Sequence, residues 1–210
     1  MSQQPSKAGS ADATIAYRLH GNCYLNITYH CTLRCAFCPK FRGSWEVQNF
    51  DLRLYNEPSA EEVLEAIGDA SGDKEVVFCG LGEPTKRLDT LLAVSRELKR
   101  RWGSRIRINT DGLANLVHGR DVTPELEGLV DVLSISMNAQ NEVTYNRHCR
   151  PREPGAYAAM LDFARRAKAH VPEVTLTAID GLPGVDIKAC AHIAAELGVG
   201  FRRRVLDIVG

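Results

Sequence analysis

Residues 24–40 read YLNITYHCTLRCAFCPK, and three cysteines fall close together in this stretch: Cys31, Cys35 and Cys38. Their spacing is C-x3-C-x2-C, with no fourth cysteine directly beyond them. The preceding run, Asn22–Thr28, alternates apolar and polar residues, which predicts a half-buried β-strand. In folds built from alternating strands and helices, ligand and metal sites lie at the carboxyl ends of the strands. The position and spacing of the thiols therefore predict a metal centre after the first strand.

Outward from this loop, apolar strand candidates alternate with amphipathic helix candidates to the end of the chain. Helices are indicated by a capping box that begins at Ser59, by a leucine stripe over residues 88–98, by Thr123-Pro124, and by apolar repeats over residues 157–164 and 187–194. The expected strands are Asn22–Thr28, Glu75–Gly80, Arg105–Thr110, Asp131–Asn138, Glu173–Asp180 and Phe201–Ile208. Six strand–helix units predict an α/β fold with a parallel sheet.

The pattern within the strands bears on whether the sheet is curled or open. Strands covered by helices on both faces are apolar throughout. Several strands here alternate instead, as in Ile106 and Ile108 against Arg107 and Asn109, so one face of the sheet is polar. This polarity favours a partial (β/α)6 TIM-like barrel with a wet interior over the alternative, an open doubly wound sheet.

The composition and the N-terminal sequence indicate which partners and which compartment to expect. Lysine plus arginine equals aspartate plus glutamate at 26 each, so we expect neither a nucleic-acid nor a membrane partner. The N-terminal residues lack the pattern of a secretory signal, which predicts a cytoplasmic protein whose clustered thiols serve metal or redox chemistry. Residues 1–13 are expected to be a disordered leader, and residues 14–210 a single domain.

The number of thiols indicates the kind of metal centre. A structural zinc site takes four ligands in a closed shell, whereas an open coordination position is typical of a centre that binds something else. His30 adjoins Cys31, and Cys23 lies at the other end of the strand, so neither completes the set easily. Iron–sulfur clusters are held by thiolates, and three protein ligands leave one iron open.

These residues carry a family resemblance. CTLRCAFC resembles the signature of radical S-adenosylmethionine (radical SAM) enzymes, with Phe37 as the aromatic residue of the motif. CGLGEP at 79–84, RINTDG at 107–112 and SISMN at 134–138 are similar to further family motifs, although Leu81 separates the two glycines of the first. SMNAQNEVTYNRHCRP and GLPGVDIKACAHIAAELGV resemble the TatD-associated branch of the superfamily.

The resemblance implies a [4Fe–4S] cluster on Cys31, Cys35 and Cys38, with S-adenosyl-L-methionine (SAM) on the open iron. Reductive cleavage of SAM would give a 5′-deoxyadenosyl radical that abstracts hydrogen from the substrate. The implied SAM-binding residues are Phe37, Gly80, Gly82, Glu83, Asn109, Ser136 and Asn138. The glycines would admit the SAM ammonium, and Glu83 would be a countercharge for that ammonium or for its loop. The resemblance also implies an electron donor of the flavodoxin or ferredoxin type.

We expect the substrate to be a small molecule or an exposed group of a macromolecule. Its candidate contacts are Asn26, Arg107, Arg202 and Arg204, and the arginines favour a carboxylate or phosphate group. We expect Cys23 and Cys190 to be buried and to pack as small apolar residues. Cys79 and Cys149 belong to no cysteine pair, and we expect Cys149 and His148 at ordinary surface positions in a loop, with a place facing substrate as the alternative.

Other functions remain open at this stage. Within radical SAM chemistry, the alternatives are a ring contraction like that of 7-carboxy-7-deazaguanine synthase and the activation of a glycyl-radical partner. A zinc-binding module without catalysis is the alternative of another class.

Overall fold

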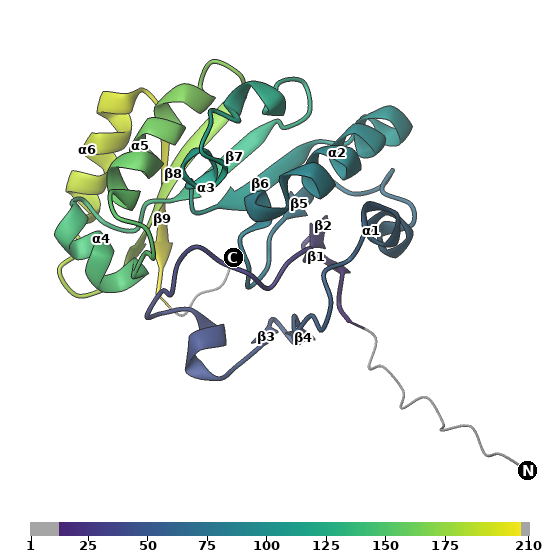
Figure 1. Ribbon diagram of the computed structural model, residues 1–210, viewed down its shortest axis with the longest axis horizontal. Coiled ribbons are helices and arrows are strands. Elements are labelled where there is room, and N and C mark those ends of the chain that lie inside the picture. The colour runs from purple at the N-terminus through teal and green to yellow at the C-terminus, as the bar shows by residue number, and fades with distance from the viewer. Residues whose placement is uncertain (1–12, 207–210) are drawn as a thin grey trace, which may run out of the picture.

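The computed structural model describes residues 13–206, so nearly all of the expected leader lies outside the described residues. A seven-stranded sheet runs through the molecule in the order β1-β2-β5-β6-β7-β8-β9 (Figure 1). Its strands are β1 (Ala16–Leu19), β2 (Asn22–Leu25), β5 (Val76–Phe78), β6 (Ile106–Thr110), β7 (Val132–Ser136), β8 (Glu173–Asp180) and β9 (Gly200–Val205). Every neighbouring pair is parallel except β1 and β2.

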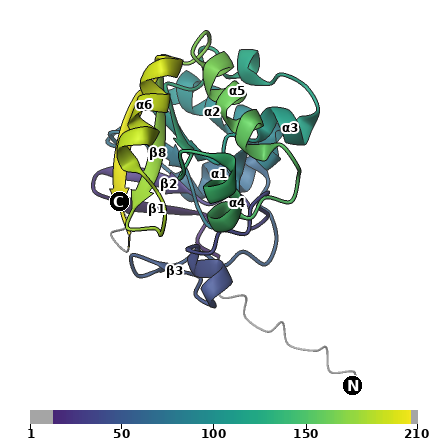
Figure 2. The ribbon, with the colours of Figure 1, turned by 90° about the vertical axis from the view of Figure 1, so that its left-hand side faces the viewer.

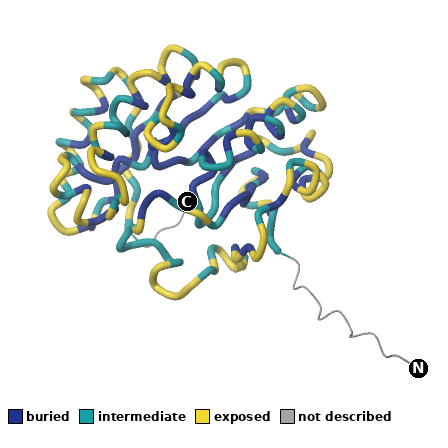
Figure 3. The backbone as a smooth tube through the Cα atoms, in the orientation of Figure 1, coloured by how far each residue is buried: buried dark blue, intermediate teal, exposed yellow. Residues whose placement is uncertain are grey.

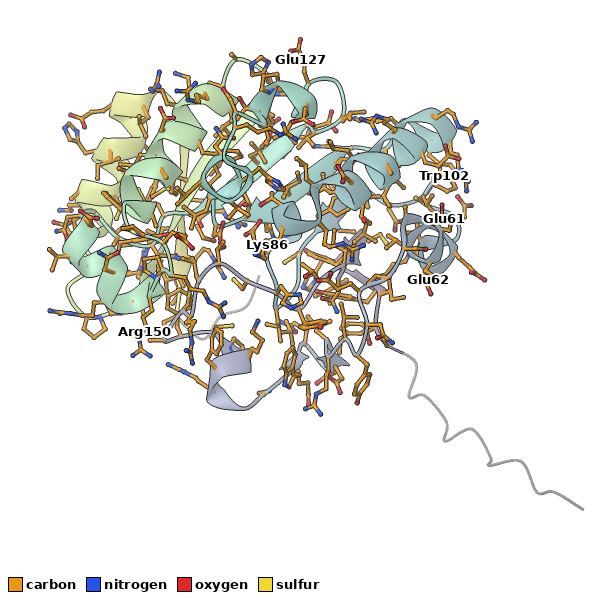
Figure 4. All side chains as sticks on the ribbon, viewed as in Figure 1. Glu61, Glu62, Lys86, Trp102, Glu127 and Arg150 are labelled. Carbon is orange, nitrogen blue, oxygen red and sulfur yellow. The ribbon has the colours of Figure 1, made fainter. Side chains whose placement is uncertain are left out.

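Helices connect the parallel strands. They are α1 (Ala60–Ile67), α2 (Leu88–Trp102), α3 (Ala114–His118), α4 (Glu142–Cys149), α5 (Ala156–Ala167) and α6 (Ile187–Leu197), with short 3-10 helices η1 (Pro39–Arg42), η2 (Pro84–Arg87) and η3 (Thr123–Leu126). The expected capping box forms at the start of α1, where Ser59 and Glu62 cap each other's backbone amides. Glu61 and Glu62 lie in the exposed first turn of this helix (Figure 4).

The core lies between the sheet and the helices. Ile106 and Ile108 of β6 are fully buried in it, whereas Arg107 and Asn109 alternate with them and are only partly buried. Side chains that alternate along a strand point to opposite faces of the sheet. The face away from the helices therefore carries the polar residues, and we call it the inner face: it comprises Tyr24, Asn26, Arg107, Asn109, Ser134, Ser136, Arg202 and Arg204. In Figure 3 the strands are largely buried and the outer sides of the helices exposed.

The predicted fold class is confirmed, with corrections to individual elements. All six expected strands are present, and they form a partial barrel that does not close, because among the described residues the edge strands β1 and β9 do not pair with each other. Two features were not predicted: β1, which pairs antiparallel with β2, and the two-stranded hairpin of β3 (Glu46–Val47) and β4 (Phe50–Asp51). The NRHCRP stretch, residues 146–151, was expected to be a loop, although residues 142–149 form α4.

The segment between β2 and α1 carries the cysteines and lies at one end of the sheet. Figures 1 and 2, turned by 90° about the vertical axis, both show η1 and the β3–β4 hairpin at the lower end of the molecule. The segment starts where β2 ends, and the parallel strands place their carboxyl ends together. Within residues 13–206, none of the helices has the length and apolar character that a membrane span needs.

Candidate iron–sulfur and cofactor site

The three cysteines occupy a loop that is fixed by its own backbone. Cys31 and Cys35 are partly buried and pack against the core, and Cys38 is the residue that precedes η1. The Cys38 amide donates to the Cys35 carbonyl at 3.1 Å, and the Phe41 amide donates to the Cys38 carbonyl at 3.1 Å. Phe37 is also partly buried and packs against the core. The spacing in the sequence therefore becomes a compact, ordered turn.

The carboxyl end of α4 holds this loop from one side. The Arg34 amide donates to the Cys149 carbonyl at 3.0 Å, and the Ala36 amide donates to the His148 carbonyl at 2.8 Å. Cys149 is fully buried and His148 nearly so, which contradicts the expectation of ordinary surface positions. Figure 4 labels Arg150, the residue that directly follows α4 and adjoins Cys149 in the chain.

Cys149 is the thiol that sequence reasoning undervalued. Its thiol lies close to that of Cys35 and raises the pKa of Cys35. The Asn138 amide nitrogen lies 3.9 Å from the Cys149 sulfur. A fourth thiol therefore lies beside the predicted cluster ligands, although it comes from another helix. Its only signal in the sequence was the quoted NRHCRP stretch, which contains no cysteine pair.

All three predicted ligands are held as thiols in the metal-free chain. Burial, then the nearby carboxylates of Asp111 and Glu83, raises the pKa of Cys31 to about 12. The neighbouring Cys149 thiol, then burial, raises the pKa of Cys35, and burial raises the pKa of Cys38. Because a thiolate is the metal ligand, binding of a metal centre here must release protons.

The donor set fits an iron–sulfur cluster. Within residues 13–206, no three His, Cys, Asp or Glu side chains are placed to hold one metal ion. A cluster makes a different demand, because each thiolate binds its own iron at a separate corner. Three thiols on one turn, without a carboxylate or imidazole among them, are donors of the type that such clusters use.

The glycine turn after β5 lies against the start of the cysteine loop. A Cβ at Gly82 would overlap the Thr28 carbonyl and lie 2.9 Å from the His30 oxygen. At Gly80, a Cβ would lie 2.5 Å from Asn26 Oδ1. The Glu83 amide donates to the His30 carbonyl at 2.8 Å. Both glycines are thus required by the close approach of two segments of this chain.

Glu83 is buried and ties its own turn to the end of β6. Its carboxylate accepts from the Thr85 amide at 3.0 Å, the Thr85 hydroxyl at 2.7 Å, the Thr110 hydroxyl at 2.8 Å and the Asp111 amide at 2.7 Å. Glu83 was expected to be a countercharge for the SAM ammonium or for its own loop. The hydrogen bonds present are to its own loop and to the end of β6.

Asp111 is a second buried acid in the same region, and sequence reasoning did not single it out. Its carboxyl accepts from the Thr32 hydroxyl and, at 3.0 Å, from the Leu113 amide. Burial, then the negative charge of Glu83, raises the pKa of Asp111. Because Thr32 adjoins Cys31, this acid also fixes the start of the cysteine loop.

Three asparagines of the site have buried amide oxygens without a partner in the described part of the chain. They are Asn26 Oδ1, Asn109 Oδ1 and Asn138 Oδ1. Asn26 holds its own position by donating to the carbonyls of Thr14 and Leu52 at 3.0 and 3.1 Å. Buried polar atoms are nearly always satisfied, so these acceptors indicate a polar ligand. Ser136 is partly buried at the end of β7, near Asn138 in the chain.

The predicted arginines also come together, on the inner face. The Arg202 guanidinium lies 3.4 Å from the Ser134 hydroxyl, and Arg107 forms an ion pair with Glu75 at 3.1 Å. Burial, then the positive charges of Arg204 and Arg107, lowers the pKa of Arg202. Cys79 also lies near Arg202, whereas Cys23 and Cys190 are buried in the core as expected.

Known proteins show similarities that agree with this geometry. The family model that describes the Radical SAM superfamily matches residues 25–197 of this chain. A relative from Pyrococcus furiosus, named as a tungsten-containing aldehyde ferredoxin oxidoreductase cofactor-modifying protein, is 35% identical over 160 residues. That alignment covers 72% of this chain and 41% of the relative, so the chain spans well under half of that protein.

Solved structures share the fold. TYW1 with a lysine-pyruvate adduct bound has a TM-score of 0.63 at 15% identity, over 90% of this chain and 66% of that one. A radical SAM methyltransferase from Sphaerobacter thermophilus has a TM-score of 0.60 at 15% identity, over 90% and 68%. Streptococcus suis SuiB bound to S-adenosylmethionine has a TM-score of 0.63 at 13% identity, over 89% and 38%.

Proposed function

Because the chain belongs to the radical SAM superfamily, we propose that Cys31, Cys35 and Cys38 hold the [4Fe–4S] cluster with which the enzyme cleaves SAM reductively. A reduced cluster held there would supply one electron for cleavage of the bond between the SAM sulfonium and C5′, and hydrogen abstraction from the substrate would follow. The observation that carries the proposal is the ordered turn of three thiols, none of which is joined to another in a disulfide.

The residues around the turn have separate tasks. The unpartnered amide oxygens of Asn26, Asn109 and Asn138 accept hydrogen bonds, which suits the ammonium and hydroxyl groups of SAM. Ser136 and Phe37 complete the polar and the aromatic side of the cofactor site. Gly80, Gly82 and Glu83 act indirectly, because they lock the turn after β5 against the cysteine loop.

The substrate is a small molecule or an exposed group of a macromolecule, and the electron donor is a protein of the flavodoxin or ferredoxin type. The name of the Pyrococcus furiosus relative refers to modification of a cofactor, which supports a small-molecule substrate here. The stretch from Ser136 to Pro151 supports membership of the TatD-associated branch.

Anaerobic reconstitution with iron and sulfide tests the proposal. We expect about four irons per chain, a brown protein, and 5′-deoxyadenosine after addition of dithionite and SAM. Replacement of Cys31, Cys35 or Cys38 by alanine should abolish both colour and cleavage, whereas Cys190→Ala, on the buried face of α6, should retain them. A colourless chain that binds one zinc ion would contradict the proposal and support a zinc module.

A further inference from the structure

Three guanidinium groups share the inner face, and the described residues supply too little negative charge to balance them. Arg107 comes from β6, and Arg202 and Arg204 come from β9. Glu75 pairs with Arg107, but it also pairs with Arg105 at 3.0 Å. Within residues 13–206, neither Arg202 nor Arg204 forms an ion pair. Like charges at close range repel, and the lowered pKa of Arg202 reflects this repulsion after burial.

These guanidiniums also have unused donors. Arg107 Nε and Arg204 Nε are buried without a hydrogen-bond partner in the described residues. The Arg202 contact to the Ser134 hydroxyl is long, at 3.4 Å. Buried donors left without partners are costly, so their presence on one face of the sheet indicates an acceptor that is supplied from outside the chain.

We propose that Arg107, Arg202 and Arg204 form a binding site for an anionic group of the substrate, either a carboxylate or a phosphate. Guanidinium groups bind both groups through paired, charge-assisted hydrogen bonds. The inference rests on the proposed function, because it assigns the inner face to the substrate of that reaction.

The register spreads the three arginines along the inner face. Arg107 pairs with Val132 at the amino end of β7. Arg202 pairs with Thr177, which in turn pairs with Ser136, and Arg204 pairs with Ile179 near the carboxyl end of β8. The proposed anion site therefore extends from the amino end of β7 to the level of Ser136, which is assigned to the SAM site.

Arg203 offers a matched control in the same strand. It alternates with Arg202 and Arg204 and forms an ion pair with Asp180 at 2.5 Å, on the side of β9 where Phe201 packs against the core. Arg203→Gln removes one positive charge from β9, as each of the other substitutions does, but leaves the inner face unchanged.

The test uses the metal-free chain, with isothermal titration of inorganic phosphate and of citrate against chloride at matched ionic strength. We expect wild type and Arg203→Gln to bind alike, and the double variant Arg202→Gln/Arg204→Gln to bind about tenfold or more weakly. The double variant should fold, because it relieves repulsion and breaks no ion pair. Circular dichroism checks this, and the two single variants provide a second series.

The outcomes are distinct. Binding of phosphate alone supports a phosphate group, binding of citrate alone supports a carboxylate, and binding of both supports the shared chemistry. Absence of binding, or binding that the double variant retains, would overturn the inference. If binding fails while the loaded enzyme still forms 5′-deoxyadenosine, only this inference falls. If arginine-dependent binding persists but no 5′-deoxyadenosine forms, the proposed function falls and the anion site stands.

Discussion

At the scale of single residues, Cys149 has the most specific consequence. Its thiol lies close to that of Cys35, and beside a Cys35 thiolate bound to iron it could only donate a hydrogen bond. Hydrogen bonds to the ligand sulfurs stabilise the more negative, reduced cluster. Cys149→Ala should therefore lower the reduction potential of the loaded cluster by roughly 20–60 mV, because 59 mV corresponds to about 1.4 kcal/mol for one electron.

A redox titration followed by electron paramagnetic resonance measures this shift. Cys149→Ser keeps a donor and should restore much of the potential, and Cys190→Ala should leave it unchanged. Equal potentials for Cys149→Ala and wild type would show that the thiol does not reach the cluster ligand.

The same residues show what the sequence could reveal. The spacing of Cys31, Cys35 and Cys38 is local, so it was visible in eight letters of sequence. The contact of Cys149 with Cys35 is tertiary and depends on how the end of α4 docks on the loop, which no spacing encodes. Asp111 was hidden for the same reason, since its environment comes from Thr32 and Glu83.

At the scale of elements, the contact between the turn after β5 and the cysteine loop can be tested at Gly82. A Cβ there would overlap the Thr28 backbone, which cannot rotate away as a side chain can. Gly82→Ala should lower the free energy of unfolding by about 1–3 kcal/mol, as overpacking does. Urea denaturation of the metal-free chain measures it.

Gly72→Ala is the matched control. Nothing lies within 4 Å of a Cβ at Gly72, so alanine there should leave stability unchanged or raise it slightly. Equal stability of the Gly82→Ala and Gly72→Ala variants would contradict the close approach of the two segments.

The elements differ in how far local pattern defines them. The strands of the parallel sheet were predictable for two reasons. Within several of them, apolar and polar residues alternate, and each strand lies between segments that have a clear helical pattern. In contrast, α4 buries only Tyr145, His148 and Cys149, too weak a stripe to read as helical. The four residues of β1 gain their place by pairing with β2 at the sheet edge, which is a tertiary property.

At the scale of the whole molecule, the cysteines couple stability to pH. Burial raises the pKa of Cys23 and Cys190 to about 11 and is the largest cause for Cys31 at about 12. A raised pKa means that the folded chain retains protons that the unfolded chain loses. The stabilisation is complete below about pH 9 and is lost as the pH rises through these folded values.

Denaturation of the metal-free chain at several pH values between about 8 and 12 should therefore show falling stability. The triple variant with alanine at Cys31, Cys35 and Cys38 should lose less over this range, because three of the buried thiols are gone. Identical pH profiles for the two chains would contradict the protonated thiols inferred here.

The most direct test of the central claim is electron paramagnetic resonance of the reduced, reconstituted protein with and without SAM. If three thiolates leave one iron open to the cofactor, addition of SAM should change the g-values of the cluster signal, and alanine at Cys31, Cys35 or Cys38 should remove that signal. A cluster signal that SAM leaves unaltered, or that survives these substitutions, would contradict the account.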